Sequence, residues 1–186
     1  LGDTGDYRII GNSTPRFKYG ITLDAAWKGF DFSIFMQGIG KRDLWLDGCY
    51  FWGANGQGNE WQSTGFAEHW DFFRPEGDPL GANLNSYYPR VNFSGDRNTK
   101  VQTRYLQNGA YLRLKNVQLG YTLPRVWTEK AGISSVRVYV SGDNLATITS
   151  LSKIFDPEAT GSLAGTGSGK LYPLQRVISV GVNVNF

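Results

Sequence analysis

The last nine residues of the chain alternate strictly between apolar and polar side chains. One parity carries Ile178, Val180, Val182, Val184 and the terminal Phe186, and the other carries Ser179, Gly181, Asn183 and Asn185. A period of two places successive side chains on opposite faces of an extended strand. The segment is therefore predicted to be a β-strand, and its wholly apolar face needs lipid or a second sheet beside it.

Four earlier segments, at about 18–27, 30–37, 111–123 and 136–141, show the same alternation. Lys28-Gly29 separates the first two and predicts a tight hairpin turn. The chain is thus predicted to be all-β, with about five antiparallel strands. The residues expected on their shared apolar face are Ile21, Leu23, Phe32, Ile34, Val117, Leu119, Val138, Val180, Val182 and Val184.

Two interruptions of the alternation carry predictions of their own. Leu112 and Leu114 are out of phase with the apolar residues that follow them, which predicts a β-bulge near Lys115-Asn116 that restores the phase. The sequence Gly142-Asp143-Asn144 is rich in turn formers and predicts that the fourth strand ends there.

Short and long connections alternate along the chain. Residues 28–29 and 124–133 are short connections, whereas about 38–109 and 142–172 are long. Long loops on one side, short turns on the other and an apolar outer face are typical of transmembrane β-barrels. Such barrels also carry aromatic girdles, and Trp27, Phe30, Tyr121 and Phe186 fall at the short-turn ends of their strands. The apolar face is therefore expected to face outer-membrane lipid.

Five strands cannot close the smallest barrel, which has eight. Residues 1–186 are therefore predicted to be the C-terminal fragment of one large barrel domain. The N-terminal part of the barrel is expected upstream of Leu1. An open sheet edge is not tolerated in hydrocarbon, which supports this expectation.

Composition excludes several classes of function. The net charge is +3, and the basic residues form no run of the kind that follows a phosphate backbone, so nucleic acid is not an expected partner. One Cys and one His provide neither a disulfide nor a zinc site, and no metal or other cofactor is expected. The chain has no apolar run long enough for a transmembrane helix.

The first long loop is unusually rich in aromatic residues. Two interpretations are open: a loop that packs on itself, and a surface that contacts a partner protein or stacks on sugars. The second makes its tryptophans candidate contact residues. These are Trp45, Trp52, Trp61 and Trp70.

No group of residues predicts an enzyme. His69 lies near carboxylates but lacks a placed nucleophile, and a packing role is favoured. Asp156 and Glu158 are adjacent loop residues and are expected to accept backbone hydrogen bonds, not to act as a glycosidase pair. The segment Gly165–Lys170 lacks the glycine and hydroxyl spacing of a phosphate-binding loop. No catalytic residue is assigned.

The order and spacing of several motifs resemble the C-terminal part of SusC/RagA-type TonB-dependent outer-membrane transporters. The resemblance extends from about Tyr7 to Phe186. The motifs are Gly11–Phe17, Gly29–Gly38, Tyr88–Arg90, Tyr111–Pro124, Arg137–Leu145, Asp156–Glu158 and Tyr172–Leu174.

This resemblance implies import of glycans or peptides across the bacterial outer membrane, with a SusD-type surface lipoprotein as partner. It also implies an internal plug and a contact with the TonB complex, both in the missing N-terminal part. Phe186 would be the terminal insertion signal.

Two alternatives remain open at this point. A soluble carbohydrate-binding β-sandwich would bury the same apolar faces against a second sheet. A siderophore-type TonB-dependent receptor would have a similar barrel, although the motifs favour the SusC type.

Overall fold

The computed structural model describes residues 7–55, 65–92, 98–160 and 171–186. The chain forms two compact units. The sheet unit comprises Pro15–Arg42, Gly109–Ser150 and Leu174–Phe186. The loop unit comprises Leu1–Thr14, Asp43–Asn108 and Leu151–Pro173.

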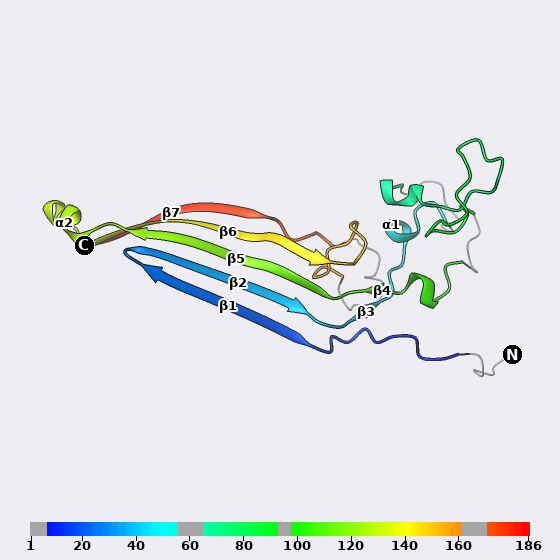
Figure 1. Ribbon diagram of the computed structural model, residues 1–186, viewed down its shortest axis with the longest axis horizontal. Helices are drawn as coiled ribbons and strands as arrows, with labels where there is room; N and C mark the ends of the chain where they lie inside the picture. The colour runs from blue at the N-terminus through cyan, green and yellow to red at the C-terminus, as the bar shows by residue number, and fades with distance from the viewer. Residues whose placement is uncertain (1–6, 56–64, 93–97, 161–170) are drawn as a thin grey trace. The chain divides into compact units, whose positions relative to one another are not determined.

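The sheet unit is a single five-stranded antiparallel sheet, as the alternation predicted. Its strands lie side by side in the order β1-β2-β5-β6-β7, and every neighbouring pair is antiparallel (Figure 1). The strands are β1 (Lys18–Trp27), β2 (Phe30–Ile39), β5 (Tyr111–Thr122), β6 (Ser135–Thr149) and β7 (Val177–Asn185).

The β1–β2 turn is the predicted two-residue hairpin. Lys28 and Gly29 both have positive φ, 46° and 90°, and Trp27 pairs with Phe30 across the turn. Two positive φ values give the turn a twist that matches that of the strands. A side chain at position 29 would meet the Thr122 carbonyl oxygen at 2.9 Å, so the turn also needs glycine for space.

The predicted bulge in β5 is confirmed. Leu114 and Asn116 pair with Met36 and Phe35 of β2, which leaves Lys115 as an extra residue. On the other side, the same two residues pair with Ala146 and Asp143 of β6. The extra residue puts Leu112 and Leu114 back on the same face as Val117, which the alternation alone would not allow.

The predicted end of the fourth strand is wrong, because β6 continues to Thr149. Gly142-Asp143-Asn144 forms an irregularity within the strand and not a turn. Asn144 has a φ of 52° and lies opposite the β5 bulge. The pairing between β5 and β6 is interrupted at this level, so the unusual backbone conformation does not end the strand, and pairing resumes at Ala146. The Asn116 side chain donates a 2.7 Å hydrogen bond to Asp143 at the same level and spans the irregularity.

The ten residues expected on the apolar face lie together on one face of the sheet. The register runs across the strands, because Leu23 pairs with Ile34 and Ile34 with Val117, while Leu119 pairs with Val140 and Val140 with Val180. Eight of the ten are exposed, whereas Ile34 and Val117 are half-buried by their neighbours. We call this surface the apolar face and the opposite one the polar face.

Aromatic residues lie side by side at the short-turn end of the apolar face. Trp27 pairs with Phe30, and Phe30 pairs with Tyr121, with 4.5 Å between the last two ring centroids. The β5–β6 connection follows, with α2 (Arg125–Thr128) and the 3-10 helix η4 (Glu129–Ala131) at this end of the sheet (Figure 1).

The loop unit has its own hydrophobic core, which we call the loop core. Its regular elements are β3 (Asp43–Leu44), β4 (Gln107–Asn108), the short helix α1 (Cys49–Trp52) and the 3-10 helices η2 (Ala67–Trp70) and η3 (Thr103–Tyr105). β3 and β4 pair antiparallel. The core residues come from both long connections: Leu44, Leu46, Phe51, Trp52, Tyr88, Tyr105, Leu151 and Phe155.

Candidate functional site

The loop core is held together by edge-to-face contacts between aromatic rings. Phe51 is fully buried and lies edge-on to Trp52, with 4.9 Å between their centroids. Trp52 in turn meets Tyr105 at 4.8 Å in the same geometry. Such pairs stabilise beyond the area that they bury. The interpretation of the loop as a segment that packs on itself therefore holds for the described part of its aromatic cluster.

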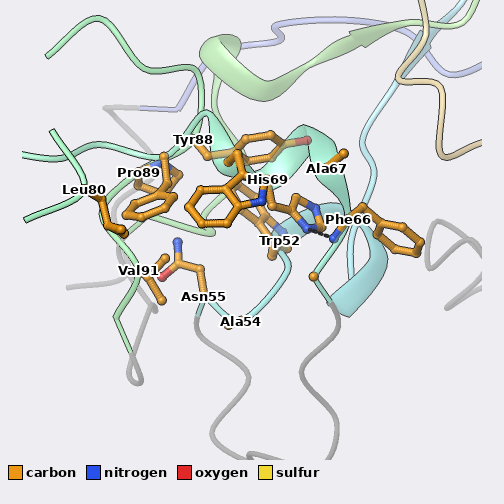
Figure 2. Close-up of a pocket in the computed structure, with 13 residues that line it drawn as sticks. Trp52, Ala54, Asn55, Phe66, Ala67, His69, Leu80, Tyr88, Pro89 and Val91 are labelled. Atoms are coloured by element: carbon orange, nitrogen blue, oxygen red, sulfur yellow. Dashed lines mark hydrogen bonds between the residues drawn. The ribbon is translucent and has the colours of Figure 1, made fainter. Parts of the chain in front are cut away.

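A cavity of about 560 Å³ opens in the loop unit beside this core. Figure 2 shows side chains from α1, from η2 and from the segment around Tyr88 converging on it. Apolar groups predominate in its lining. The lining residues are Trp52, Ala54, Asn55, Gly65, Phe66, Ala67, His69, Trp70, Phe72, Leu80, Tyr88, Pro89 and Val91.

His69 of η2 is fixed by two hydrogen bonds to the backbone. Its Nδ1 accepts a bond from the Phe66 N–H at 3.1 Å, and its Nε2 therefore carries the proton that it donates to the Phe51 carbonyl at 3.1 Å. Gly53, with φ of 62°, approaches the ring so closely that a side chain there would meet Nδ1 at 2.8 Å. Both ring nitrogens are engaged, so the arrangement supports the expected packing role and not that of a catalytic base.

Glu68 connects two distant parts of the loop unit. Its carboxylate accepts hydrogen bonds from the Tyr88 hydroxyl at 3.0 Å and from the Ser152 hydroxyl at 2.9 Å. Burial raises the pKa of the Tyr88 phenol well above its usual value, and the Glu68 charge raises it further. Tyr88 therefore stays protonated and can donate this hydrogen bond. The bond from Ser152 to Glu68 links the second long connection to the first.

The candidate tryptophans have different environments. Trp52 belongs to the loop core and is 3% exposed, whereas Trp70 is 63% exposed. Trp45 is partly buried and packs against the core. Trp61 lies outside the described residues. Of the four, Trp70 is thus the described side chain most available to a partner.

The remaining loop candidates have structural positions or lie outside the description. Asp156 accepts a 2.9 Å hydrogen bond from the Glu158 N–H, which is the loop-structuring role expected of it. The glycine-rich segment Gly165–Lys170 lies outside the described residues. Among the residues that the structure does describe, no group of three or more His, Cys, Asp or Glu side chains is placed to hold a metal ion.

The polar face carries an ion pair that the sequence did not reveal. The Arg137 guanidinium of β6 bonds to both carboxylate oxygens of Asp31 on β2, with Nε to Oδ2 at 2.8 Å. The pair lies over Gly120 of the intervening β5, where a side chain would meet both charged groups. No local motif signals this contact, because its partners are 106 residues apart.

In the described parts of the chain, no helix has the length and apolar character needed to cross a membrane.

The fold defines the class of the protein: the sheet unit is a segment of a large antiparallel β-barrel. No family model matches the chain. It is 32% identical to TonB-dependent receptor P3 of Formosa agariphila over an alignment of 193 residues, and 28% identical to TonB-dependent receptor P26 of the same organism. Each alignment covers 98% of this chain and 18% of the relative.

Comparison with solved structures points to the same kind of protein as these relatives. The chain matches the RagAB peptide transporter with a TM-score of 0.71 and 29% identity, and the RagAB peptide importer in its open-open state with 0.71 and 27%. Each match covers 96% of this chain and 18% of the other. These matches confirm the predicted resemblance to a segment of SusC/RagA-type TonB-dependent proteins, and the chain spans about a fifth of the length of these relatives.

Proposed function

We propose that the protein containing this chain is a TonB-dependent transporter that imports glycans or peptides across the outer membrane together with a SusD-type lipoprotein. In this proposal the chain supplies five strands of the barrel wall and two outer-loop segments. The observation that carries it is the exposed apolar face, which continues without interruption from β1 to β7.

The two faces of the sheet suit a membrane barrel. Val180 on the apolar face is 75% exposed. Water-soluble proteins rarely expose an apolar surface that extends across a whole sheet. The adjacent rings of Trp27, Phe30 and Tyr121 suit an interface girdle on the same face. The polar face, with Asp31 and Arg137, would line the barrel interior. Phe186, which directly follows β7 and is 91% exposed, suits the proposed role of insertion signal.

Other parts of the protein would complete the barrel. Five strands are fewer than the eight of the smallest barrel, and the chain spans 18% of its relatives. We therefore assign to this chain the C-terminal part of one barrel domain, with outer loops at about 38–109 and 142–172. The plug and the segment that contacts TonB would belong to the N-terminal remainder.

The loop unit is the part of this chain that we assign to partner or substrate contact. The solved neighbours are described as a peptide importer and transporter named RagAB, which supports peptides as one substrate class and a second component as partner. Exposed Trp70 and partly buried Trp45 offer the aromatic surface that is enriched at interface hot spots.

Gene deletion and affinity isolation test the proposal together. The full-length protein, tagged and isolated from outer membranes, should bring down a lipoprotein, and the deletion strain should lose uptake of labelled oligopeptides or oligosaccharides. A protein recovered from the soluble fraction would contradict the proposal. A deletion phenotype repaired by iron salts alone would instead identify an iron-chelate receptor.

A further inference from the structure

We propose that α2, in the β5–β6 connection, anchors the barrel in the phospholipid leaflet at its short-turn end. In this arrangement Val126 and Trp127 lie among the lipid headgroups, and Arg125 and Lys130 contact anionic phosphates. The inference rests on the proposed function, because it takes the apolar face of the sheet to be in lipid. It adds a membrane contact outside the strands and the kind of lipid that this contact prefers.

Two large apolar side chains of α2 are exposed side by side. Val126 is 68% exposed and Trp127 is 65% exposed. The next residue, Thr128, is buried, and its hydroxyl donates a hydrogen bond to the Arg125 carbonyl. The helix is therefore packed through Thr128, while Val126 and Trp127 are left for an apolar environment outside the sheet unit.

α2 lies at the end of the sheet where other apolar residues are exposed (Figure 1). On the apolar face at this end, Trp27 is 69% exposed and Phe30 is 48% exposed. The Thr122 N–H of β5 donates to the Gly29 carbonyl of the β1–β2 turn, and α2 follows at Arg125. The helix is thus placed at the level where the proposed lipid face ends, which is where tryptophan is enriched in membrane proteins.

Further strands of the barrel would not lie beside α2. The helix joins β5 to β6, and both of these strands are paired on each side within the sheet. Additional strands can pair only with the free edges of β1 and β7. The surface of α2 is therefore covered by lipid, or by a protein that reaches the short-turn end of the barrel.

The charges around α2 favour anionic lipid. Arg125 precedes the exposed apolar pair, Lys130 follows it, and Glu129 is the acidic residue of the connection 124–134. In the neighbouring turn, the Lys28 ammonium lies 4.9 Å from the centroid of the Trp27 ring. None of the three basic side chains forms an ion pair with a described residue. Tryptophan and valine between basic residues suit a headgroup layer, in which apolar groups reach the acyl boundary and cations meet phosphates.

The test measures whether lipid touches α2 in the full-length protein. Val126→Cys is made in a protein whose other cysteines, including Cys49, are replaced by serine, and the thiol is labelled with bimane. The protein is reconstituted in vesicles of phosphatidylcholine and phosphatidylglycerol, and one of the two lipids at a time carries a nitroxide quencher on its acyl chain. We expect both lipids to quench the label, and phosphatidylglycerol to quench it more strongly at equal content.

Two other labelled positions serve as references. Val180→Cys, on the apolar face, should be quenched by both lipids, whereas Leu84→Cys, at an exposed position of the loop unit, should not be quenched. Heat-modifiable gel mobility checks the folding of each variant. Trp127→Cys, labelled in the same way, takes the place of Val126→Cys if that variant does not assemble.

A matched pair of double variants tests the role of charge. Arg125→Gln with Lys130→Gln removes two exposed positive charges at α2, and Lys100→Gln with Lys153→Gln removes two in the loop unit. The first should reduce the preference of the label at position 126 for phosphatidylglycerol by about 5-fold, the effect of one basic residue at an anionic surface. The second should leave this preference unchanged.

The outcomes separate this inference from the proposed function. Quenching at position 180 but not at 126 would overturn the inference alone, and a label at 126 that is also shielded from aqueous iodide would identify a protein as the cover of α2. An unchanged lipid preference in the α2 double variant would overturn the contact of Arg125 and Lys130 with anionic phosphates. No quenching at either position would overturn the membrane location of the sheet, and with it the proposed function.

Discussion

Asp31 and Arg137 form an ion pair over a glycine on the polar face of the sheet. They belong to β2 and β6, which are not neighbours, and their side chains meet above Gly120 of β5. A side chain at position 120 would occupy the same space. The ion pair therefore links β2 to β6 across β5, and Gly120 of β5 leaves the space in which the two side chains meet.

This arrangement predicts that Asp31→Ala and Gly120→Ala destabilise the barrel by similar, non-additive amounts. Asp31→Ala removes one partner of the ion pair and Gly120→Ala pushes the two partners apart, so the second change should have little effect once the first has broken the pair. The measurement is the temperature at which the full-length barrel loses its heat-modifiable gel mobility. Ser33→Ala, on the same face of β2, is the control. Additive effects would show that Gly120 has another role.

The two faces predict opposite responses to charge at adjacent positions of β7. Val180→Arg places a charge on the proposed lipid face and should cost about 2–4 kcal/mol if the residue lies near the membrane midplane, whereas Ser179→Arg should be tolerated. Folded yield in lipid vesicles of increasing urea content measures the difference. Equal damage from both would contradict the proposed facing.

The β5 bulge predicts that folding requires a residue at position 115 but does not require the Lys115 side chain. Deletion of Lys115 should shift 111–114 by one position and turn Arg113 toward the apolar face, which prevents folding into the membrane. Lys115→Ala keeps the residue count and should fold normally. Assembly in outer membranes, followed by protease protection, compares the two variants, and a functional deletion would show that the bulge is dispensable.

The buried tyrosines predict that the loop unit loses stability in alkali. Burial raises the pKa of Tyr87, Tyr88 and Tyr105 in the folded protein. In the unfolded chain a phenol ionises near pH 10, so above about pH 10 the unfolded state binds fewer protons and the free energy of unfolding falls. Limited proteolysis of the loops between pH 8 and 11 should show increasing cleavage. Tyr88→Phe should reduce this dependence, and a profile unchanged by that variant would contradict the role assigned to Tyr88.

The two hydrogen bonds of His69 predict a specific cost for its loss. His69→Ala leaves the Phe66 N–H and the Phe51 carbonyl without their partner and should destabilise the loop unit by about 1–3 kcal/mol. Glu76→Ala, in the same long connection, serves as a surface control. Protease susceptibility of the loops in the folded full-length protein is the measurement, and equal susceptibility of both variants would rule out the packing role.

Local sequence patterns could predict the sheet because strand geometry is local. The period of two set the faces of all five strands, and the phase change before Val117 located the bulge at Lys115. The same reasoning failed at Gly142-Asp143-Asn144, where turn-forming residues lie inside β6. The neighbouring strand β5 is the reason that β6 continues here. Its bulge accommodates the Asn144 conformation, which would otherwise end a strand.

The sequence by itself determined the strands, their apolar face and the family resemblance, because these depend on the spacing of neighbouring residues. Only the tertiary structure decided that Asp31 meets Arg137, that Glu68 joins Tyr88 to Ser152, and that Trp52 is buried beside a cavity while Trp70 is exposed. These contacts join residues far apart in the chain. They depend on the sheet register and on the packing of irregular loops. Neither of these produces a repeating pattern in the sequence from which the contacts could be predicted.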